Sequence, residues 1–355
     1  MGKITTEIRY SQTLTEDVLD LLQAYDPNQQ FLLCDTHTAT HCLPTLMQSD
    51  QLQHIKVIRT QAGDAHKNVE TLTEIWKFFS QNGATRKSIL INLGGGMITD
   101  LGGFAAATFK RGMDCIHIPT TLLSAVDAAV GGKTGINFNG LKNEIGAFHM
   151  PKAVLIHTPF FKSLDAQNRQ SGFAEMLKHG LLSDPEYLSS LLQLNLDTPE
   201  TEAFQLAVKR SIDIKYEITT MDPTEKGIRK ALNLGHTLGH AFESLSHEQH
   251  RPVLHGYAVA WGLIGELFLA TKLCGFPVST LHQMATYIVK EYGRFELSDS
   301  DEARIMEYMR HDKKNEGQEI NFTLLSDVGT IRLDQFAQPQ QLQDMLNYFR
   351  TCMQS

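Results

Sequence analysis

The stretch Ser88-Ile-Leu-Ile-Asn-Leu-Gly-Gly-Gly-Met-Ile-Thr-Asp-Leu-Gly-Gly-Phe104 joins a short apolar run to a glycine-rich loop and then to a helical pattern. An apolar run bounded in this way predicts a buried strand, and the pattern from Asp100 to Phe109 predicts a helix. Glycines at the start of a helix can let backbone N–H groups approach a pyrophosphate. The loop lacks the G-x-G-x-x-G spacing, so the glycines alone favour a tight turn as strongly as a cofactor loop.

The same alternation of short apolar runs and helical patterns extends over residues 30–157, which predicts a parallel sheet flanked by helices. Further strands are expected at Phe31–Asp35, His54–Ile58 and Cys115–Pro119, and a further helix at Glu70–Ser80. Beyond about Phe160 the strand signals fade and amphipathic helices follow. We therefore expect an α/β protein with two domains, a Rossmann-like parallel-sheet domain over residues 1–157 and a mostly α-helical domain over residues 158–355.

Composition excludes several classes of function. The chain has 355 residues, of which 42% are hydrophobic and 20% charged, and its formal net charge is -8. The negative charge and the lack of a lysine- or arginine-rich run argue against nucleic acid as a partner. The longest apolar segment, Tyr257–Ala270, carries Glu266 and is too short to span a bilayer, so no membrane partner is expected. No secretory signal is recognisable, and five scattered cysteines indicate free thiols, so we expect a cytoplasmic protein.

A second stretch, Arg229-Lys-Ala-Leu-Asn-Leu-Gly-His-Thr-Leu-Gly-His-Ala-Phe-Glu243, carries a cation, an amide and two imidazoles in what its pattern predicts to be three helical turns. His236 and His240 stand four residues apart, so they share one helix face. This spacing does not decide whether either histidine binds a metal. His255 opens a long apolar helix, and Glu175 lies in another helical pattern. One carboxylate with two imidazoles is a ligand set of catalytic zinc, with one position left open.

These motifs resemble those of the 3-dehydroquinate synthase family, the cyclases of the shikimate pathway. The resemblance runs from about Cys34 to Asp312-Lys313-Lys314 and includes Gly235-His-Thr-Leu-Gly-His240, His255-Gly-Tyr-Ala258 and Ala174-Glu-Met-Leu-Lys178. It implies that Glu175, His236 and His255 bind Zn²⁺, with Co²⁺ as an alternative. It assigns His240 to proton handling and substrate contact instead, a choice that spacing cannot make.

The resemblance also implies NAD as a cofactor, bound through the loop that contains Gly95, Gly96 and Asp100. Thr99 departs from the family pattern, which usually has glycine there, and Asp64 replaces a longer glutamate. Asp35 ends an expected strand, where it could accept from a ribose or simply form a turn. The remaining cofactor contacts that the resemblance implies are Asp35, Asp64, Lys67, Thr120, Thr121, Lys142, Phe160 and Ser163.

The substrate implied by the resemblance is a sugar phosphate that also carries a carboxylate, which needs charge-assisted donors at both ends. The residues matched to substrate binding are Arg111, Asp127, Lys133, Asn143, Lys178, Lys215, Arg229, Asn233, His240 and either Lys313 or Lys314, with Lys313 preferred. Arg111 matches an arginine that reaches the neighbouring subunit, so a homodimer is expected. The expected catalytic residues are His240, Lys133, Asp127 and Glu225. Glu225 could equally be a helix-start acid or an ion-pair partner of Arg229.

The function implied is conversion of 3-deoxy-D-arabino-heptulosonate 7-phosphate into 3-dehydroquinate and phosphate. The implied steps are transient oxidation by NAD, β-elimination of phosphate, reduction, ring opening and aldol closure. Two alternatives use similar parts: another sugar phosphate cyclase, acting on sedoheptulose 7-phosphate or glucose 6-phosphate, and a metal-dependent NAD polyol dehydrogenase. A catalytically dead relative serving as a binding module would not be expected to keep Glu175, His236 and His255 together.

Overall fold

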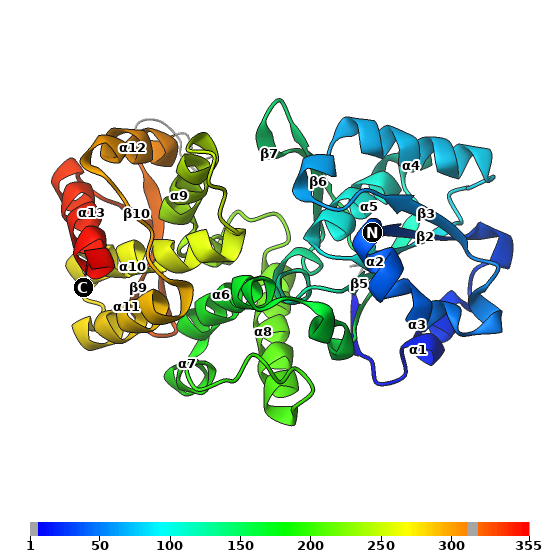
Figure 1. Ribbon diagram of the computed structural model, residues 1–355, viewed down its shortest axis with the longest axis horizontal. Helices are drawn as coiled ribbons and strands as arrows, with labels where there is room; N and C mark the ends of the chain where they lie inside the picture. The colour runs from blue at the N-terminus through cyan, green and yellow to red at the C-terminus, as the bar shows by residue number, and fades with distance from the viewer. Residues whose placement is uncertain (1–5, 311–318, 355) are drawn as a thin grey trace. The chain divides into compact units, whose positions relative to one another are not determined.

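The computed structural model describes residues 6–310 and 319–354 and divides into two compact units (Figure 1). The first unit runs to Asp165 and takes in Asp197–Gln205. The second comprises Ala166–Leu196 and the chain from Leu206 onward. The boundary expected near residue 157 therefore lies within the first unit.

Six parallel strands form the sheet of the first unit, in the order β1-β8-β5-β4-β2-β3. They are β1 (Glu7–Tyr10), β2 (Gln30–Asp35), β3 (Lys56–Thr60), β4 (Ile89–Gly94), β5 (Asp114–Pro119) and β8 (Ala153–Ile156). Every residue of β2, β4 and β8 is buried, as expected for a parallel sheet covered on both faces. The predicted α/β fold and its four predicted strands are confirmed. The sequence does not reveal β1 and β8, because four-residue runs carry little pattern.

Helices cover both faces of this sheet because successive strand residues point to opposite sides. On one face Leu32 and Ile91 pack with α1 (Leu14–Leu22) and α3 (Leu43–Met47). On the other face Phe31 and Leu90 pack with α4 (Val69–Gln81) and α5 (Gly96–Thr108). A short helix, α2 (Thr36–His41), follows β2 directly. Both predicted helices of this region are confirmed, although α5 begins at Gly96 rather than Asp100.

A hairpin of β6 (Lys133–Phe138) and β7 (Leu141–Phe148) completes the first unit and was not predicted. Ile136 is buried among the residues that α4 and α5 contribute to the core. Most of β7 is exposed, so it lacks the alternation of apolar and polar residues that marks a half-buried strand. The hairpin is therefore a feature that the sequence pattern conceals.

The second unit is mostly helical, as expected. Its helices are α6 (Ala166–Ser183), α7 (Pro185–Leu191), α8 (Glu202–Met221), α9 (His236–Glu248), α10 (His255–Leu273), α11 (Val278–Tyr292), α12 (Glu302–Arg310) and α13 (Pro339–Gln354). An antiparallel hairpin, β9 (Asn321–Asp327) with β10 (Thr330–Phe336), was not predicted. Helix α10 is buried along most of its length. Across residues 6–310 and 319–354, no helix is long and apolar enough to cross a membrane.

Candidate active site

The histidine stretch is not one continuous helix, so the prediction of three helical turns from Arg229 is wrong. Arg229 and Asn233 lie in a 3₁₀ segment, Ile228–Asn233, and α9 begins only at His236. Gly235 breaks the chain between them with a left-handed φ of 79°. A Cβ at Gly235 would lie 2.8 Å from Leu263 Cδ2 and 3.1 Å from the Val259 carbonyl oxygen, so packing against α10 requires glycine there.

Three side chains from three helices meet in the second unit. Glu175 of α6, His236 of α9 and His255 of α10 each offer a ligand atom, and these atoms lie within 4.8 Å of one another. The Glu175 carboxylate is 3.4 Å from His236 Nε2 and 3.5 Å from His255 Nε2. The predicted trio is therefore together in space, in an arrangement that could hold one ion.

The surroundings of Glu175 fit a divalent cation. Its side chain is fully buried, and its carboxylate faces the Lys178 ammonium and the Nε2 atoms of His236 and His255. Burial alone would raise the pKa of Glu175, but the charge of Lys178 and the contacts with the His236 and His255 imidazoles hold it well below its usual value. Lys178 forms an ion pair with this carboxylate and donates to the Leu232 carbonyl oxygen at 2.8 Å. An ionised, buried carboxylate beside two imidazoles is a donor set suited to zinc or cobalt.

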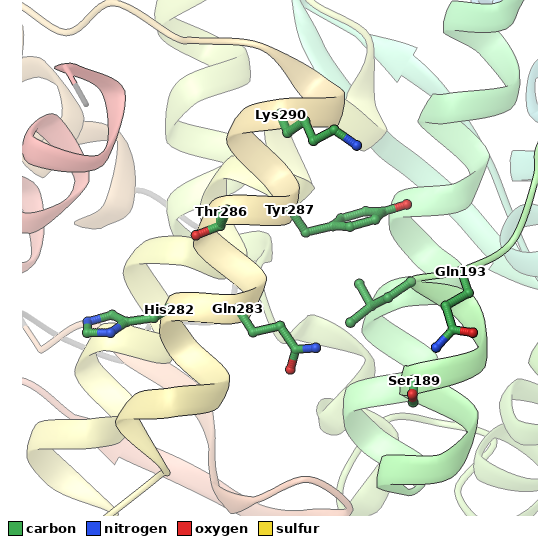
Figure 2. Close-up of a pocket in the computed structure, with 8 residues that line it drawn as sticks. Ser189, Gln193, His282, Gln283, Thr286, Tyr287 and Lys290 are labelled. Atoms are coloured by element: carbon green, nitrogen blue, oxygen red, sulfur yellow. The ribbon is translucent and has the colours of Figure 1, made fainter.

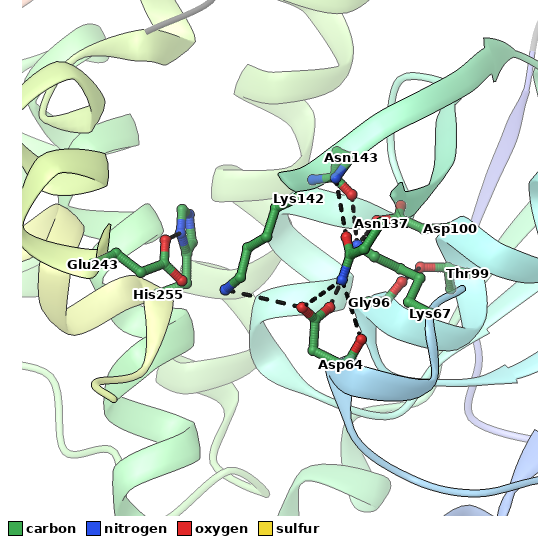
Figure 3. Close-up of polar contacts among 10 residues, drawn as sticks. All are labelled: Asp64, Lys67, Gly96, Thr99, Asp100, Asn137, Lys142, Asn143, Glu243 and His255. Atoms are coloured by element: carbon green, nitrogen blue, oxygen red, sulfur yellow. Dashed lines mark hydrogen bonds and ion pairs between the residues drawn. The ribbon is translucent and has the colours of Figure 1, made fainter. Parts of the chain in front are cut away.

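The two imidazoles are oriented by their other nitrogens. His236 Nδ1 lies 3.1 Å from the Leu234 carbonyl oxygen, and His255 Nδ1 lies 3.3 Å from Glu243 Oε2 (Figure 3). Such contacts select the tautomer that leaves Nε2 for a metal. Glu243 is a site residue that the sequence analysis missed. Its position seven residues after His236, on the same helical face, is a signal that could have found it.

The electrostatics of the two histidines differ. Burial, assisted by the charge of Lys178, lowers the pKa of His236 to about 3. Burial acts in the same direction on His255, but the hydrogen bonds that the Glu175 and Glu243 carboxylates accept from its ring outweigh it and raise the pKa of His255 to about 10. A protonated His255 and the ammonium of Lys178 therefore balance the carboxylates of Glu175 and Glu243.

His240 lies at the edge of this cluster. Its ring centroid is 5.3 Å from that of His236 and 5.9 Å from that of His255. The shared helix face predicted for His236 and His240 is confirmed. His240 is not part of the set whose ligand atoms converge, so it stands next to the cluster rather than within it.

The remaining predicted residues of the second unit lie on α8 and in or just before the 3₁₀ segment Ile228–Asn233. Arg229 is buried and donates from Nη1 to the Pro223 carbonyl oxygen at 2.8 Å. Asn233 Nδ2 donates to Glu225 Oε1 at 3.0 Å, which links two predicted residues directly. Lys215 of α8 is also buried. Lys313 and Lys314 lie outside the described residues.

A second polar cluster gathers in the first unit around Lys67. Its ammonium lies 2.6 Å from Asn143 Oδ1, 3.1 Å from Asp100 Oδ2 and 3.5 Å from Asp64 Oδ1 (Figure 3). Burial would lower the pKa of Lys67, but Asp100 and Asp64 raise it, so Lys67 stays charged. Asn137 of β6 donates to Asp64 Oδ2 at 2.9 Å and accepts from the Asn143 backbone. Asn137 joins the β6–β7 hairpin to this cluster and was not predicted.

The glycine loop lies directly before α5. Gly95 is the N-cap of α5 and Gly96 its first residue, and a Cβ at Gly95 would lie 3.0 Å from Thr121 Cγ2. Thr99 is buried, and its hydroxyl donates to the Gly96 carbonyl oxygen at 3.2 Å. Thr99, which stands where the family usually has glycine, therefore uses its hydroxyl in a hydrogen bond to the backbone of its own helix.

The other residues matched to the cofactor or substrate are distributed over the first unit. Asp35 caps α2, accepting from the Thr38 backbone N–H at 2.8 Å, which is the turn-forming role that its sequence position allowed. The remaining residues are placed as follows: Thr120 and Thr121 after β5, Asp127 in a π-helical turn, Lys133 at the start of β6, Lys142 on β7, exposed Arg111 with a φ of 67°, buried Phe160, and Ser163 bonded to the Phe160 carbonyl oxygen.

A separate pocket lies between α7 and α11 of the second unit. Figure 2 shows Gln283 and Tyr287 of α11 reaching towards the side of Gln193. None of the residues predicted for the site lines this pocket. It therefore adds nothing to the metal cluster.

Comparison with known proteins identifies the family. Sequence models of the 3-dehydroquinate synthase N-terminal and C-terminal regions match residues 57–171 and 172–315. The chain is 48% identical to a 3-dehydroquinate synthase of Parabacteroides distasonis over 95% of this chain and 96% of the relative.

Solved structures share the fold. The 2-epi-5-epi-valiolone synthase of Streptomyces hygroscopicus subsp. jinggangensis, with NAD+ and Zn2+ bound, superposes with a TM-score of 0.87 at 21% identity, over 99% of this chain and 98% of that one. A 2-deoxy-scyllo-inosose synthase complexed with carbaglucose-6-phosphate, NAD+ and Co2+ gives 0.82 at 21% identity, over 96% and 95%. From the two matched regions and the near full-length relative, this chain belongs to the 3-dehydroquinate synthase family.

Proposed function

We propose that the chain is a carbon–oxygen lyase acting on phosphates. In this proposal it converts 3-deoxy-D-arabino-heptulosonate 7-phosphate into 3-dehydroquinate and phosphate with NAD and one Zn²⁺ or Co²⁺ ion. The observation that carries the proposal is the convergence of Glu175, His236 and His255 in a member of this family. Support for the cofactors comes from the two cyclases of the same fold, which hold NAD+ with Zn2+ or Co2+.

The metal would be held by Glu175 Oε1 or Oε2 and by the Nε2 atoms of His236 and His255. When bound, the ion supplies a Lewis acid for a substrate hydroxyl, and the nicotinamide accepts and later returns a hydride. Glu243 and the Leu234 carbonyl oxygen hold the two imidazoles in the tautomer that this requires. Lys178 pairs with Glu175 and so limits the net charge of the cluster.

Proton transfer is assigned to His240. Its ring stands beside the cluster without joining it, and an imidazole exchanges protons near neutral pH. Arg229 and Lys215 are buried cations in the same unit, and a planar guanidinium suits a carboxylate or phosphate. The Glu225–Asn233 hydrogen bond would hold the Asn233 amide in place for substrate.

The first unit would bind NAD. The backbone N–H groups at the start of α5 can receive a pyrophosphate, because a helix N-terminus favours an anion. Lys67 donates to Asp100 of α5 and to Asn143 of β7, so it links α5 to the β6–β7 hairpin. We expect this link to stabilise the glycine loop at the start of α5. Asp64 and Lys142, whose charged groups lie 3.9 Å apart, would also contact the NAD.

Assembly and compartment follow from the same proposal. Arg111 is exposed in a left-handed backbone conformation, presented away from the first unit's core, and we expect it to reach the active site of a second copy in a homodimer. All five cysteines are free, in keeping with a reducing cytoplasm.

The decisive experiment supplies the heptulosonate phosphate, NAD and Zn²⁺, and follows phosphate release and the absorbance of reduced nicotinamide together. We expect many phosphates per NAD with no net NADH. A polyol dehydrogenase would instead accumulate one NADH per substrate without releasing phosphate. Turnover of sedoheptulose 7-phosphate or glucose 6-phosphate in place of the heptulosonate would assign the chain to another cyclase reaction.

A further inference from the structure

Glu266 is a buried carboxylate that the proposed mechanism does not use. It lies in the apolar helix α10 and its side chain is fully buried. A charge in such a place is costly unless it is hydrogen-bonded. Glu266 Oε2 accepts from the Gly235 backbone N–H at 2.6 Å, and Glu266 Oε1 accepts from the Leu238 backbone N–H at 3.0 Å.

These two donors belong to the first turn of α9. Gly235 is the N-cap of that helix and Leu238 its third residue, so both N–H groups are among those that a helix leaves unsatisfied. An N-cap side chain commonly accepts from the third residue. Gly235 has no side chain, and its φ and its contacts with Leu263 leave no room for one. Glu266 supplies the cap from the neighbouring helix.

Close packing of α9 against α10 makes this reach possible. A Cβ at Gly262 would lie 2.1 Å from the Gly235 carbonyl oxygen and 2.7 Å from the Gly239 backbone nitrogen. Glu266 follows Gly262 by one helical turn and therefore lies on the same face of α10. The capped turn begins with His236, while α10 itself begins with His255. Helix α10 thus provides His255 at its start, and through Glu266 it also holds the first turn of α9, which provides His236.

We propose that Glu266 is a positioning residue that holds His236 in register with His255 and so sets the metal affinity of the site. The proposal rests on the metal binding proposed above. It predicts that losing one of the two hydrogen bonds loosens the first turn of α9, so that the His236 ring is no longer held where a metal needs it. Residues that orient metal ligands typically change affinity by 10-fold to 100-fold when they are substituted.

The test compares three variants of the full chain. Glu266→Gln keeps the volume and one oxygen acceptor. Met284→Ala removes a fully buried side chain from α11, which carries no residue of the cluster, and serves as the matched destabilised control. His236→Ala is the reference for a missing ligand. The measurements are zinc affinity by chelator competition, the visible spectrum of the Co²⁺ form and thermal stability.

We expect Glu266→Gln to weaken zinc binding about tenfold and to alter the Co²⁺ spectrum, whereas Met284→Ala lowers thermal stability with both unchanged. A zinc affinity and a Co²⁺ spectrum like those of the wild type in Glu266→Gln would overturn the proposal. The proposal would also be overturned if Met284→Ala, at the same thermal stability, lost as much zinc affinity as Glu266→Gln. If Glu266→Gln does not fold, Glu266→Asp, which keeps the charge at a shorter reach, is expected to give the same result and is judged by the same outcomes. Equal zinc affinity in His236→Ala and the wild type would reject the metal site itself.

Discussion

At the scale of single residues, the cluster of Glu175, His236 and His255 depends on balanced charge. Glu175 is ionised and fully buried, and the partners approaching it are the ammonium of Lys178 and two imidazoles. Removing one partner from a buried ion pair leaves an uncompensated charge. A divalent ion between this carboxylate and the two imidazoles would add positive charge beside a buried anion. The charge and geometry of these residues therefore suit one divalent cation.

His236 and His240 give a matched pair of substitutions, because they are neighbours on one helix with different positions relative to Glu175. His236→Ala should lose both bound metal and turnover, because the Glu175 carboxylate and the His255 imidazole alone leave the proposed ion with two protein ligands instead of three. His240→Ala should keep its metal and lose about 10²- to 10⁴-fold in turnover, the usual contribution of a general acid or base. Metal analysis of the purified variants with steady-state rates checks both. If His236→Ala kept its full metal content, or if His240→Ala lost its metal, the assignment of His236 as ligand and His240 as proton-transfer residue would be wrong.

The sequence predicts the shared face of this pair but not its division of labour. Spacing of four places both rings on one side of α9, and their centroids are only 5.3 Å apart. Which ring points its Nε2 at Glu175 depends on contacts from Leu234 and on the position of α6, and neither is encoded in the spacing. Only resemblance to a family could separate the two histidines beforehand.

His117 provides a test by pH in the first unit. It is buried in β5, with Nδ1 3.1 Å from Asn92 Nδ2, and burial, with a smaller contribution from His149, lowers its pKa to about 3. An unfolded histidine titrates near pH 6.5, so its neutral form contributes stability above that pH and loses it as pH falls towards 3. Between pH 7 and pH 5 we expect the wild type to lose about 2 kcal/mol more than His117→Gln.

Urea unfolding at the two pH values measures this difference. The chain has two tryptophans, and Trp76 lies in the first unit, so a Trp261→Phe background makes fluorescence report that unit alone. His149 and His157, whose pKa values burial also lowers, are present in both proteins, so the difference reports His117 together with its coupling to His149. Equal pH dependence with and without His117 would show that this ring does not titrate on unfolding.

At the scale of elements, the cluster is built where helix backbones come very close. A Cβ at Gly256 would lie 1.8 Å from the Ser171 carbonyl oxygen, and the Gly256 N–H donates to Ser171 Oγ at 3.1 Å. Ser171 lies one turn before Glu175 on α6, and Gly256 follows His255 on α10. The distance between two cluster residues is therefore set by one glycine and one hydroxyl.

Gly256→Ala tests this packing. The clash is with backbone, which cannot rotate away, so α10 must shift from α6; overpacking of this kind costs about 1–3 kcal/mol or more. We expect a lower unfolding temperature and weaker zinc binding together. Lys272→Ala, at an exposed position of the same helix, should change stability by less than about 0.5 kcal/mol. Unchanged zinc affinity in Gly256→Ala would mean that α6 and α10 tolerate a different spacing.

The elements that the sequence misses are those whose conformation is decided by distant neighbours. The break at Gly235 follows from crowding by Leu263 and Val259, which are far along the chain. The β6–β7 hairpin is exposed along most of β7 and so carries no alternation. The sheet strands and α4 were predictable because their own burial patterns carry the signal.

At the scale of the whole molecule, the chain divides into two compact units, and each has its own polar cluster. The three cluster residues that could hold a metal all belong to the second unit, and the polar cluster around Lys67 belongs to the first. Each unit is therefore expected to respond to its own ligand, because a ligand that binds only the folded form stabilises that form by mass action.

Single-tryptophan proteins can separate these responses. Trp76→Phe leaves Trp261 in α10 to report the second unit, and Trp261→Phe leaves Trp76 in α4 to report the first. At a concentration 100 times its dissociation constant, a ligand adds about 2.7 kcal/mol. Zinc should therefore raise the melting temperature seen by Trp261, and NAD the one seen by Trp76. Glu175→Gln should abolish the zinc shift and keep the NAD shift. Equal shifts at both tryptophans with either ligand would show that the two units unfold as one cooperative block, and would contradict this division.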